Sequence, residues 1–121
     1  MLNNSDGKFN LEERTTKFST NVLDLCKSNK ILILNQNIIK QLLRSATSIG
    51  ANYFEANGAN SKKDFVHKIS ICKKEARETR YWLSLLLNTN FEKEKYIKIL
   101  AQECKELTLI FSKIILTINK K

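Results

Sequence analysis

The sequence predicts an all-α protein, folded as an antiparallel up-down-up-down four-helix bundle. The chain has no proline and only three glycines in 121 residues, so it has few residues that stop helices or form tight turns. Apolar residues recur at spacings of three and four along four long segments, as in helices with one buried face. We therefore expect one domain over residues 1–121, with helices at about 11–28, 36–57, 62–87 and 91–118.

The first helix is expected to begin after Asn10, a good N-cap residue, and to bury Phe18, Val22, Leu25 and Cys26. The apolar segment 31–34 that follows has the composition of a strand. A single strand would lack a partner, so we expect a packed connector there instead.

Small residues around Gly50 predict a close approach of another helix to the second helix, because glycine is otherwise costly inside a helix. Gly58 is expected to follow the end of this helix as its C′ residue. The residues expected on its buried face are Ile39, Leu42, Ala46, Ile49, Tyr53 and Ala56.

The third helix is expected to begin at a capping box, Ser61 to Asp64. A short connection at 88–90 then predicts that the fourth helix is its antiparallel neighbour. The buried face of the third helix is expected to contain Phe65, Ile69, Cys72, Ala76, Thr79, Leu83 and Leu86; that of the fourth, Ile97, Leu100, Cys104, Leu107, Phe111, Ile114 and Ile118.

Composition narrows the class of protein. The net charge is +9, and residues 61–90 carry seven bases against three acids, which favours a polyanionic partner over a purely solubilising charge. Because the sequence has neither a membrane-spanning apolar run nor a signal peptide, we expect a cytoplasmic protein without membrane contact. The three cysteines are expected to be reduced core residues.

Two groups of residues together resemble a known family. The first is Arg44–Asn52 with Glu55–Ala56, and the second is Ser61–Phe65 with Lys73, Glu75–Thr79 and Tyr81–Leu83. With their spacing they resemble the four helix bundle proteins encoded in bacterial 23S rRNA intervening sequences. The accessory variability determinant proteins of diversity-generating retroelements are similar.

The resemblance covers residues 10–118, and it implies a bundle that assembles as a ring-shaped homopentamer. Its retroelement members bind a reverse transcriptase and contact RNA, so the resemblance suggests nucleic acid and a reverse transcriptase or other polymerase as partners; for the intervening-sequence members it implies no established role. Many members have a proline ahead of the second helix, where this chain has residues 31–35. The missing proline therefore bears on the geometry of the connection between the first two helices and not on the fold.

One side of the third helix is predicted to bind nucleic acid. On an ideal helix, six bases of the third helix fall within a sector of about 120°, turned away from the apolar side. They would contact phosphates, and Tyr81 at the edge would stack on a base; the alternative is a solvated lysine face. The bases are Lys62, Lys63, Lys73, Lys74, Arg77 and Arg80.

The opposite flank of the third helix holds Glu75, Glu78 and Trp82. A subunit interface anchored by the tryptophan is one interpretation; the other is that Trp82 completes the core of its own chain. Arg44 and Glu55 share one side of the second helix, so we expect them to pair with third-helix residues rather than to act in catalysis.

No catalytic, cofactor or metal site is predicted. His67 is the sole histidine, and no glycine-rich phosphate loop occurs. The sequence therefore predicts a non-catalytic, basic, oligomeric scaffold or accessory protein that binds RNA or DNA. The alternative is a protein-interaction adaptor, for example for a reverse transcriptase, whose basic face contacts no nucleic acid.

Overall fold

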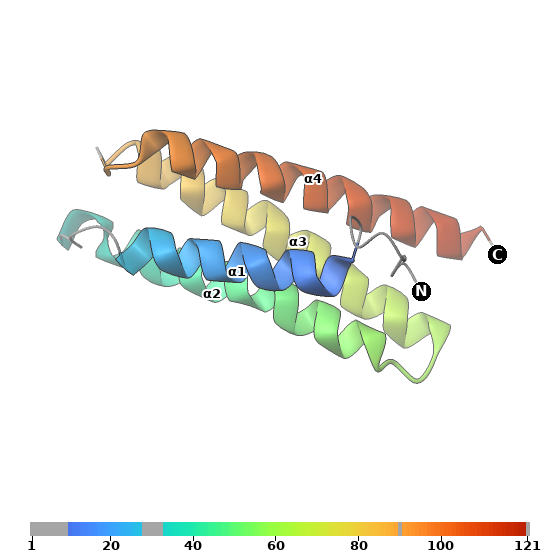
Figure 1. The fold of residues 1–121 in the computed structure, drawn as a ribbon. Coiled ribbons are helices and arrows are strands. Elements are labelled where there is room, and N and C mark those ends of the chain that lie inside the picture. The colour runs from blue at the N-terminus through green and yellow to red at the C-terminus, as the bar shows by residue number, and fades with distance from the viewer. Residues whose placement is uncertain (1–9, 28–32, 90, 121) are drawn as a thin grey trace.

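A computed structural model describes residues 10–27, 33–89 and 91–120, which form four helices arranged as Figure 1 shows. They are α1 (Leu11–Lys27), α2 (Ile33–Asn57), α3 (Lys62–Leu87) and α4 (Glu94–Asn119). Within these ranges no residue forms a strand. The predicted all-α class with four helices is confirmed.

Each helix packs on two neighbours. α2 and α4 both contact α1, and both also contact α3. The start of α1, the end of α4 and the α2–α3 connection lie at one end of the molecule in Figure 1, and the α3–α4 connection lies at the other. α3 therefore contacts both α2 and α4, and the residues on the side turned away from them, the open side of α3, are exposed.

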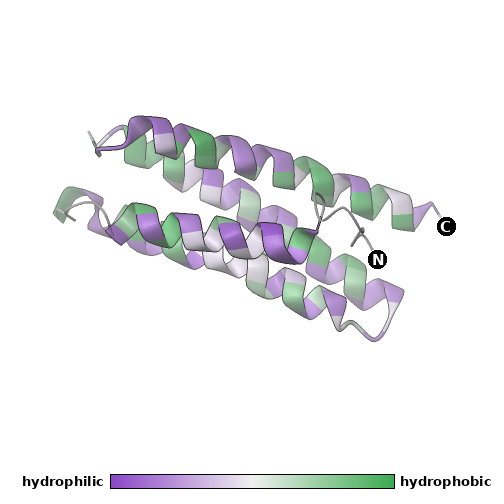
Figure 2. Cartoon of the chain, in the orientation of Figure 1, coloured by the Kyte–Doolittle hydropathy of each residue, from purple (hydrophilic) through white to green (hydrophobic). Residues whose placement is uncertain are grey.

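The core consists of the apolar faces that the spacing predicted. All the residues expected to be buried in α1 and α2 are buried, and so are those of α3 and α4 except Phe65 and Ile118, which are half-buried. Hydrophobic and hydrophilic residues alternate around every helix in Figure 2. Because burying one large aliphatic or aromatic side chain contributes about 1.5–3 kcal/mol, this shared core is the main source of stability.

The predicted helix starts at Asn10 and Ser61 are confirmed by their hydrogen bonds. The Asn10 side chain accepts from the Glu13 amide at 3.2 Å, and the Ser61 hydroxyl accepts from the Asp64 amide at 3.0 Å. Each bond satisfies an amide that the first turn leaves without a helical acceptor.

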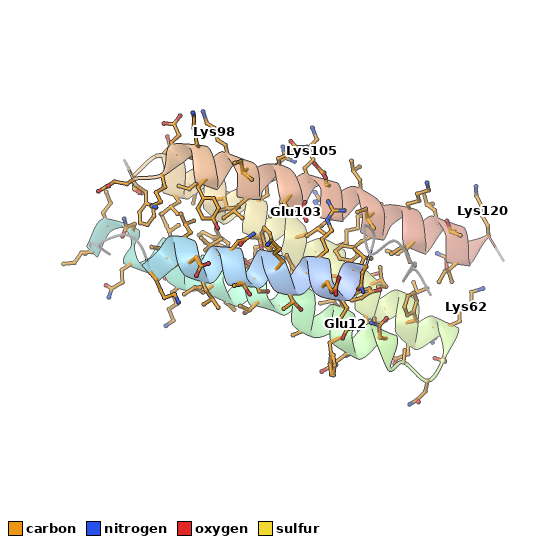
Figure 3. The ribbon with its side chains drawn as sticks, in the orientation of Figure 1. Glu12, Lys62, Lys98, Glu103, Lys105 and Lys120 are labelled. Atoms are coloured by element: carbon orange, nitrogen blue, oxygen red, sulfur yellow. The ribbon has the colours of Figure 1, made fainter. Side chains whose placement is uncertain are left out.

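An ion-pair cluster links α1 to α4 away from the apolar core. The Arg14 guanidinium donates to Glu103 at 2.6 Å and to Glu106 at 2.9 Å, and Figure 3 shows Glu103 pointing from α4 toward α1. The Glu103 hydrogen bond is the main reason why the pKa of Arg14 is raised. Because these charges are partly shielded from water, they fix α1 against α4 more firmly than a fully exposed pair would.

The start of α2 differs from the prediction. The helix begins at Ile33 rather than at 36, and its first residues are exposed, Ile33 at 92% and Leu34 at 71%. The expected packed connector over 31–34 is therefore wrong for residues 33 and 34, while 31 and 32 lie outside the described residues. The apolar run was misinterpreted because Asn35, a polar residue, takes the buried position of this first turn.

The start of α4 also differs, because the chain turns for longer than expected. The helix begins at Glu94 rather than at 91, after Lys93 in the left-handed conformation (φ 73°, ψ 44°). Phe91 is nevertheless buried in the core, ahead of the helix. The prediction placed the helix start directly after the connection at 88–90, because the spacing of apolar residues locates a helix boundary only to within a few residues.

The expected close approach of another helix at Gly50 is confirmed, and Gly58 follows the end of α2 as expected, but without the left-handed conformation usual for a C′ glycine. The Gly58 amide donates to the Glu55 carbonyl at 3.0 Å. Gly50 does face another helix, α1. A Cβ at Gly50 would lie 3.6 Å from atoms of Thr15 and Ser19, which is ordinary van der Waals contact. The close approach therefore tolerates a methyl group at Gly50.

Replacing Gly50 with alanine is expected to raise the free energy of unfolding by about 0.5–1 kcal/mol, because alanine favours the helix and fits beside α1. Urea denaturation monitored by circular dichroism measures the change. Gly50→Leu serves as the control and should destabilise, because its side chain extends beyond the available space. A lower stability for the alanine variant would contradict the distance between α1 and α2 described above.

The cysteines are buried and free, as predicted. Burial raises the pKa of Cys26 to about 11 and the pKa of Cys72 and of Cys104 to about 12. Thiols with such pKa values are almost fully protonated near neutral pH and are poor nucleophiles. Among the described helices, none is long and apolar enough to cross a membrane.

Candidate nucleic-acid interface

The predicted basic residues lie along the open side of α3. Five of them are exposed, and Lys73 is half-buried; Tyr81 is 55% exposed. The buried face of the helix is turned toward α2 and α4 and holds none of them. The exposed bases are Lys62, Lys63, Lys74, Arg77 and Arg80.

These six bases form no ion pair and no side-chain hydrogen bond with any other described residue. The other base of α3, Lys68, pairs with Glu55 of α2 at 2.8 Å. Lys68 therefore stabilises the bundle, whereas the charges of the six bases on the open side remain available to another molecule.

A shallow hollow brings several predicted residues together at the middle of α3. Ser70, Lys73, Lys74, Arg77, Glu78 and Tyr81 line it. Their positions follow from the helical repeat, because residues three, four and seven apart share a side. Lys62 and Lys63 lie at the start of α3, away from this hollow; Figure 3 shows Lys62 at the end of the molecule.

α4 carries exposed bases of its own. Arg80 lies close enough to Cys104 of α4 for its charge to act on that thiol. Lys105, next in the chain, is exposed, and Figure 3 shows Lys98 and Lys105 pointing away from the bundle. Lys98 pairs with Glu94 at 2.8 Å, whereas Lys105 has no partner in the described parts of the chain.

Lys105 and Ser70 were missed from the sequence. The basic residues of the fourth segment were counted but not placed by face, because the position of one helix beside another does not follow from the period of either. The seven-residue spacing of Lys98 and Lys105 was the available signal that they share a side.

The acidic flank of α3 is held by Arg44 of α2. The Arg44 guanidinium donates to Glu75 at 3.3 Å and also to Glu78, and the Trp82 indole donates to the same Glu78 carboxylate at 3.0 Å. The expected pairing of Arg44 and Glu55 with third-helix residues is confirmed. The Trp82 hydrogen bond, followed by that of Arg44, lowers the pKa of Glu78.

Each residue predicted for a subunit interface has a partner within its own chain. Glu75 is only 7% exposed and faces Arg44, and half-buried Trp82 packs against the hydrophobic core. Beside them, the buried Thr79 hydroxyl donates to Ser45 of α2 at 2.9 Å. The flank therefore joins α2 to α3. The solvent-exposed part of Trp82 is the part of the flank that can contact another molecule.

His67, the only histidine, is exposed on α3. No group of three or more potential metal ligands is found among the described side chains.

Substituting Arg44 with methionine is expected to lower the free energy of unfolding by about 1–3 kcal/mol, because the buried Glu75 loses its charged partner. Lys40→Met is the matched control, since Lys40 is exposed one turn earlier on the same helix and forms no ion pair within the described ranges. Chemical denaturation at neutral pH measures both.

The effect of Arg44→Met is also expected to depend on pH. Because the folded-state pKa of Glu78 is lowered, its contribution is present above the unfolded-state pKa, about 4.3, and is lost as the pH falls through the folded value. The stability difference between wild type and variant should therefore shrink on acidification below about pH 4. A difference that grows on acidification would contradict the Arg44–Glu78 pairing.

The fold and this surface together define a small four-helix protein with a basic face on α3 and a paired acidic flank beside it. The model of the 23S rRNA-intervening sequence protein family matches residues 8–113, so the chain belongs to that family.

A crystal structure of a protein with unknown function from the S23 ribosomal protein family of Bacteroides thetaiotaomicron is similar in fold. It is 34% identical, with a TM-score of 0.74, and the match covers 86% of this chain and 96% of that one. A search of curated proteins found no match.

Proposed function

We propose that the protein is a non-catalytic scaffold that binds nucleic acid through the basic side of α3. The observation that carries this proposal is the line of bases on α3 that form no ion pair with any described residue. Glu78 lines the hollow beside these bases, but Arg44 pairs with it and with Glu75, so the negative charge there is partly compensated. The family name directs the choice of ligand to RNA, and the first probe should be RNA.

The proposal includes the assembly: an up-down-up-down bundle that forms a homopentameric ring, with the flank of Glu75, Glu78 and Trp82 at the subunit contact. A ring would repeat the basic side five times. Weak single-site binding would then gain strength, because after one site binds, the others act at a high effective concentration.

The oligomer is tested by native mass spectrometry at near-physiological ionic strength. The expected principal species has about five times the 14.0 kDa mass of one chain. Trp82→Ala is expected to shift the distribution toward smaller species, and Phe54→Ala, which removes an exposed aromatic residue of α2, serves as the control. A wild-type protein that stays monomeric would rule out the ring.

Nucleic-acid binding is tested with the quadruple variant Lys73→Gln, Lys74→Gln, Arg77→Gln and Arg80→Gln. RNA affinity is expected to fall at least about tenfold, because several phosphate contacts and their counterion release are lost. Helicity should persist, since none of the four is fully buried. Fluorescence anisotropy with labelled RNA over a range of salt concentrations measures the affinity and its salt dependence.

The control is a second quadruple variant that removes the same amount of positive charge from other helices. It replaces four exposed lysines that have no ion pair in the described parts of the chain, namely Lys17, Lys40, Lys95 and Lys113. If both quadruple variants lose the same affinity, net charge rather than the α3 surface governs binding, and the site is wrong.

A protein-interaction adaptor, for instance for a reverse transcriptase, is the second candidate. Leu109 and Leu116 favour it, because they lie seven residues apart on one side of α4 and are 62% and 63% exposed. Retained RNA affinity in the α3 variant, together with polymerase binding that does not change with salt, would select this alternative.

A further inference from the structure

We infer that the hollow at the middle of α3 is built for an unpaired nucleotide, with Tyr81 stacking on the base and Lys73, Lys74 and Arg77 contacting the phosphates beside it. The ligand class is a single-stranded nucleic-acid segment rather than a duplex. This inference rests on the proposed function and specifies which form of nucleic acid the basic side takes.

The first support is the exposure of Tyr81. A tyrosine of a helical bundle usually buries its ring and keeps only its hydroxyl in water, yet this residue is 55% exposed and lines the hollow with the three bases. Tyr53, by contrast, lies in the core and is only 3% exposed. An exposed ring among cations is the combination that holds single strands, because every base has a face that can stack.

The second support is that Tyr81 has a rigid neighbour. Its ring lies edge to face with Trp82, at 5.1 Å between centroids and 70° between planes. The Trp82 indole is itself fixed by its hydrogen bond to Glu78, which Arg44 holds from α2. Fixing a side chain before binding lowers the entropy lost when the ligand arrives.

The third support is the length and straightness of the charged line. Lys62 and Arg80 are 18 positions apart on one uninterrupted helix, a rise of roughly 27 Å. A flexible single strand can follow such a straight line of bases. A duplex presents its phosphates on a curved surface and keeps its bases stacked inside, where Tyr81 cannot reach a base face.

Glu78 is the one carboxylate in the hollow, and it opposes phosphate binding unless its charge is compensated. Arg44 and Trp82 both donate to it, and Lys74 also acts on its charge. The carboxylate is thus engaged on the α2 side, while Lys73, Arg77 and Tyr81 remain available to a ligand.

The experiment compares a labelled single-stranded RNA of about a dozen nucleotides with a duplex of equal length, using the full chain. Wild type is expected to bind the single strand more tightly. Tyr81→Leu should weaken single-strand binding about tenfold, because stacking contributes about 1–3 kcal/mol per base, and should leave duplex binding unchanged. Tyr81→Phe keeps the ring and should bind as wild type does.

The salt dependence separates stacking from charge. Tyr81→Leu removes no phosphate contact, so the slope of log affinity against log salt should stay unchanged, whereas the quadruple α3 variant should lower it. The single tryptophan gives a second readout: Trp82 lies beside Tyr81, so its fluorescence should change when the single strand binds. Phe54→Leu controls for the loss of an exposed aromatic ring.

Each outcome decides between the two proposals. Single-strand binding that depends on Tyr81 supports the inference. Equal affinity for strand and duplex, unaffected by Tyr81→Leu but weakened by the quadruple variant, overturns the inference and leaves the proposed function standing. No binding of either RNA by wild type overturns both.

Discussion

The rotation of α3 about its own axis is the constraint on which the proposed surface depends. Two independent features fix it: the apolar stripe buried against α2 and α4, and the Arg44 guanidinium that holds Glu75 and Glu78. A helix with only an apolar stripe can rotate by some tens of degrees without losing much buried area. The hydrogen bonds of Arg44 require particular directions, so they set which residues face solvent. The exposure of Arg77 and Tyr81 follows from that geometry.

The charged residues on the two sides of α3 differ in whether they form ion pairs. On the side toward α2, opposite charges meet, in the Lys68–Glu55 and Arg44–Glu75 pairs. On the open side, the cations form no ion pair with any described residue. Partly buried charges need a partner because desolvation penalises an isolated one, whereas exposed charges are stabilised by water. Burial therefore explains why Glu75 is paired; it gives no reason for the line of cations opposite.

The sequence was sufficient for the helices and their buried faces, because a period of 3.6 residues is a property of each segment alone. It was insufficient where the structure depends on how two segments pack against each other. Lys93 in a left-handed turn and buried Phe91 ahead of α4 depend on the path between helices. The α3 bases could be placed on one side from spacing. The side on which Lys105 lies relative to α3 depends on the position of α4, which the period of either helix does not give.

The cations on α3 have an energetic cost. Lys73 and Arg77 are four residues apart, Lys74 and Arg77 three, and Arg77 and Arg80 three; each such pair of like charges destabilises a helix by a few tenths of a kcal/mol. Phosphates bound along the line would reverse that repulsion into attraction, and every nucleic acid carries such phosphates. Tyr81 distinguishes a single strand from a duplex, because a base face is accessible only where the strand is unpaired. The charges therefore account for attraction to nucleic acid in general, and the exposed ring accounts for the choice among its forms.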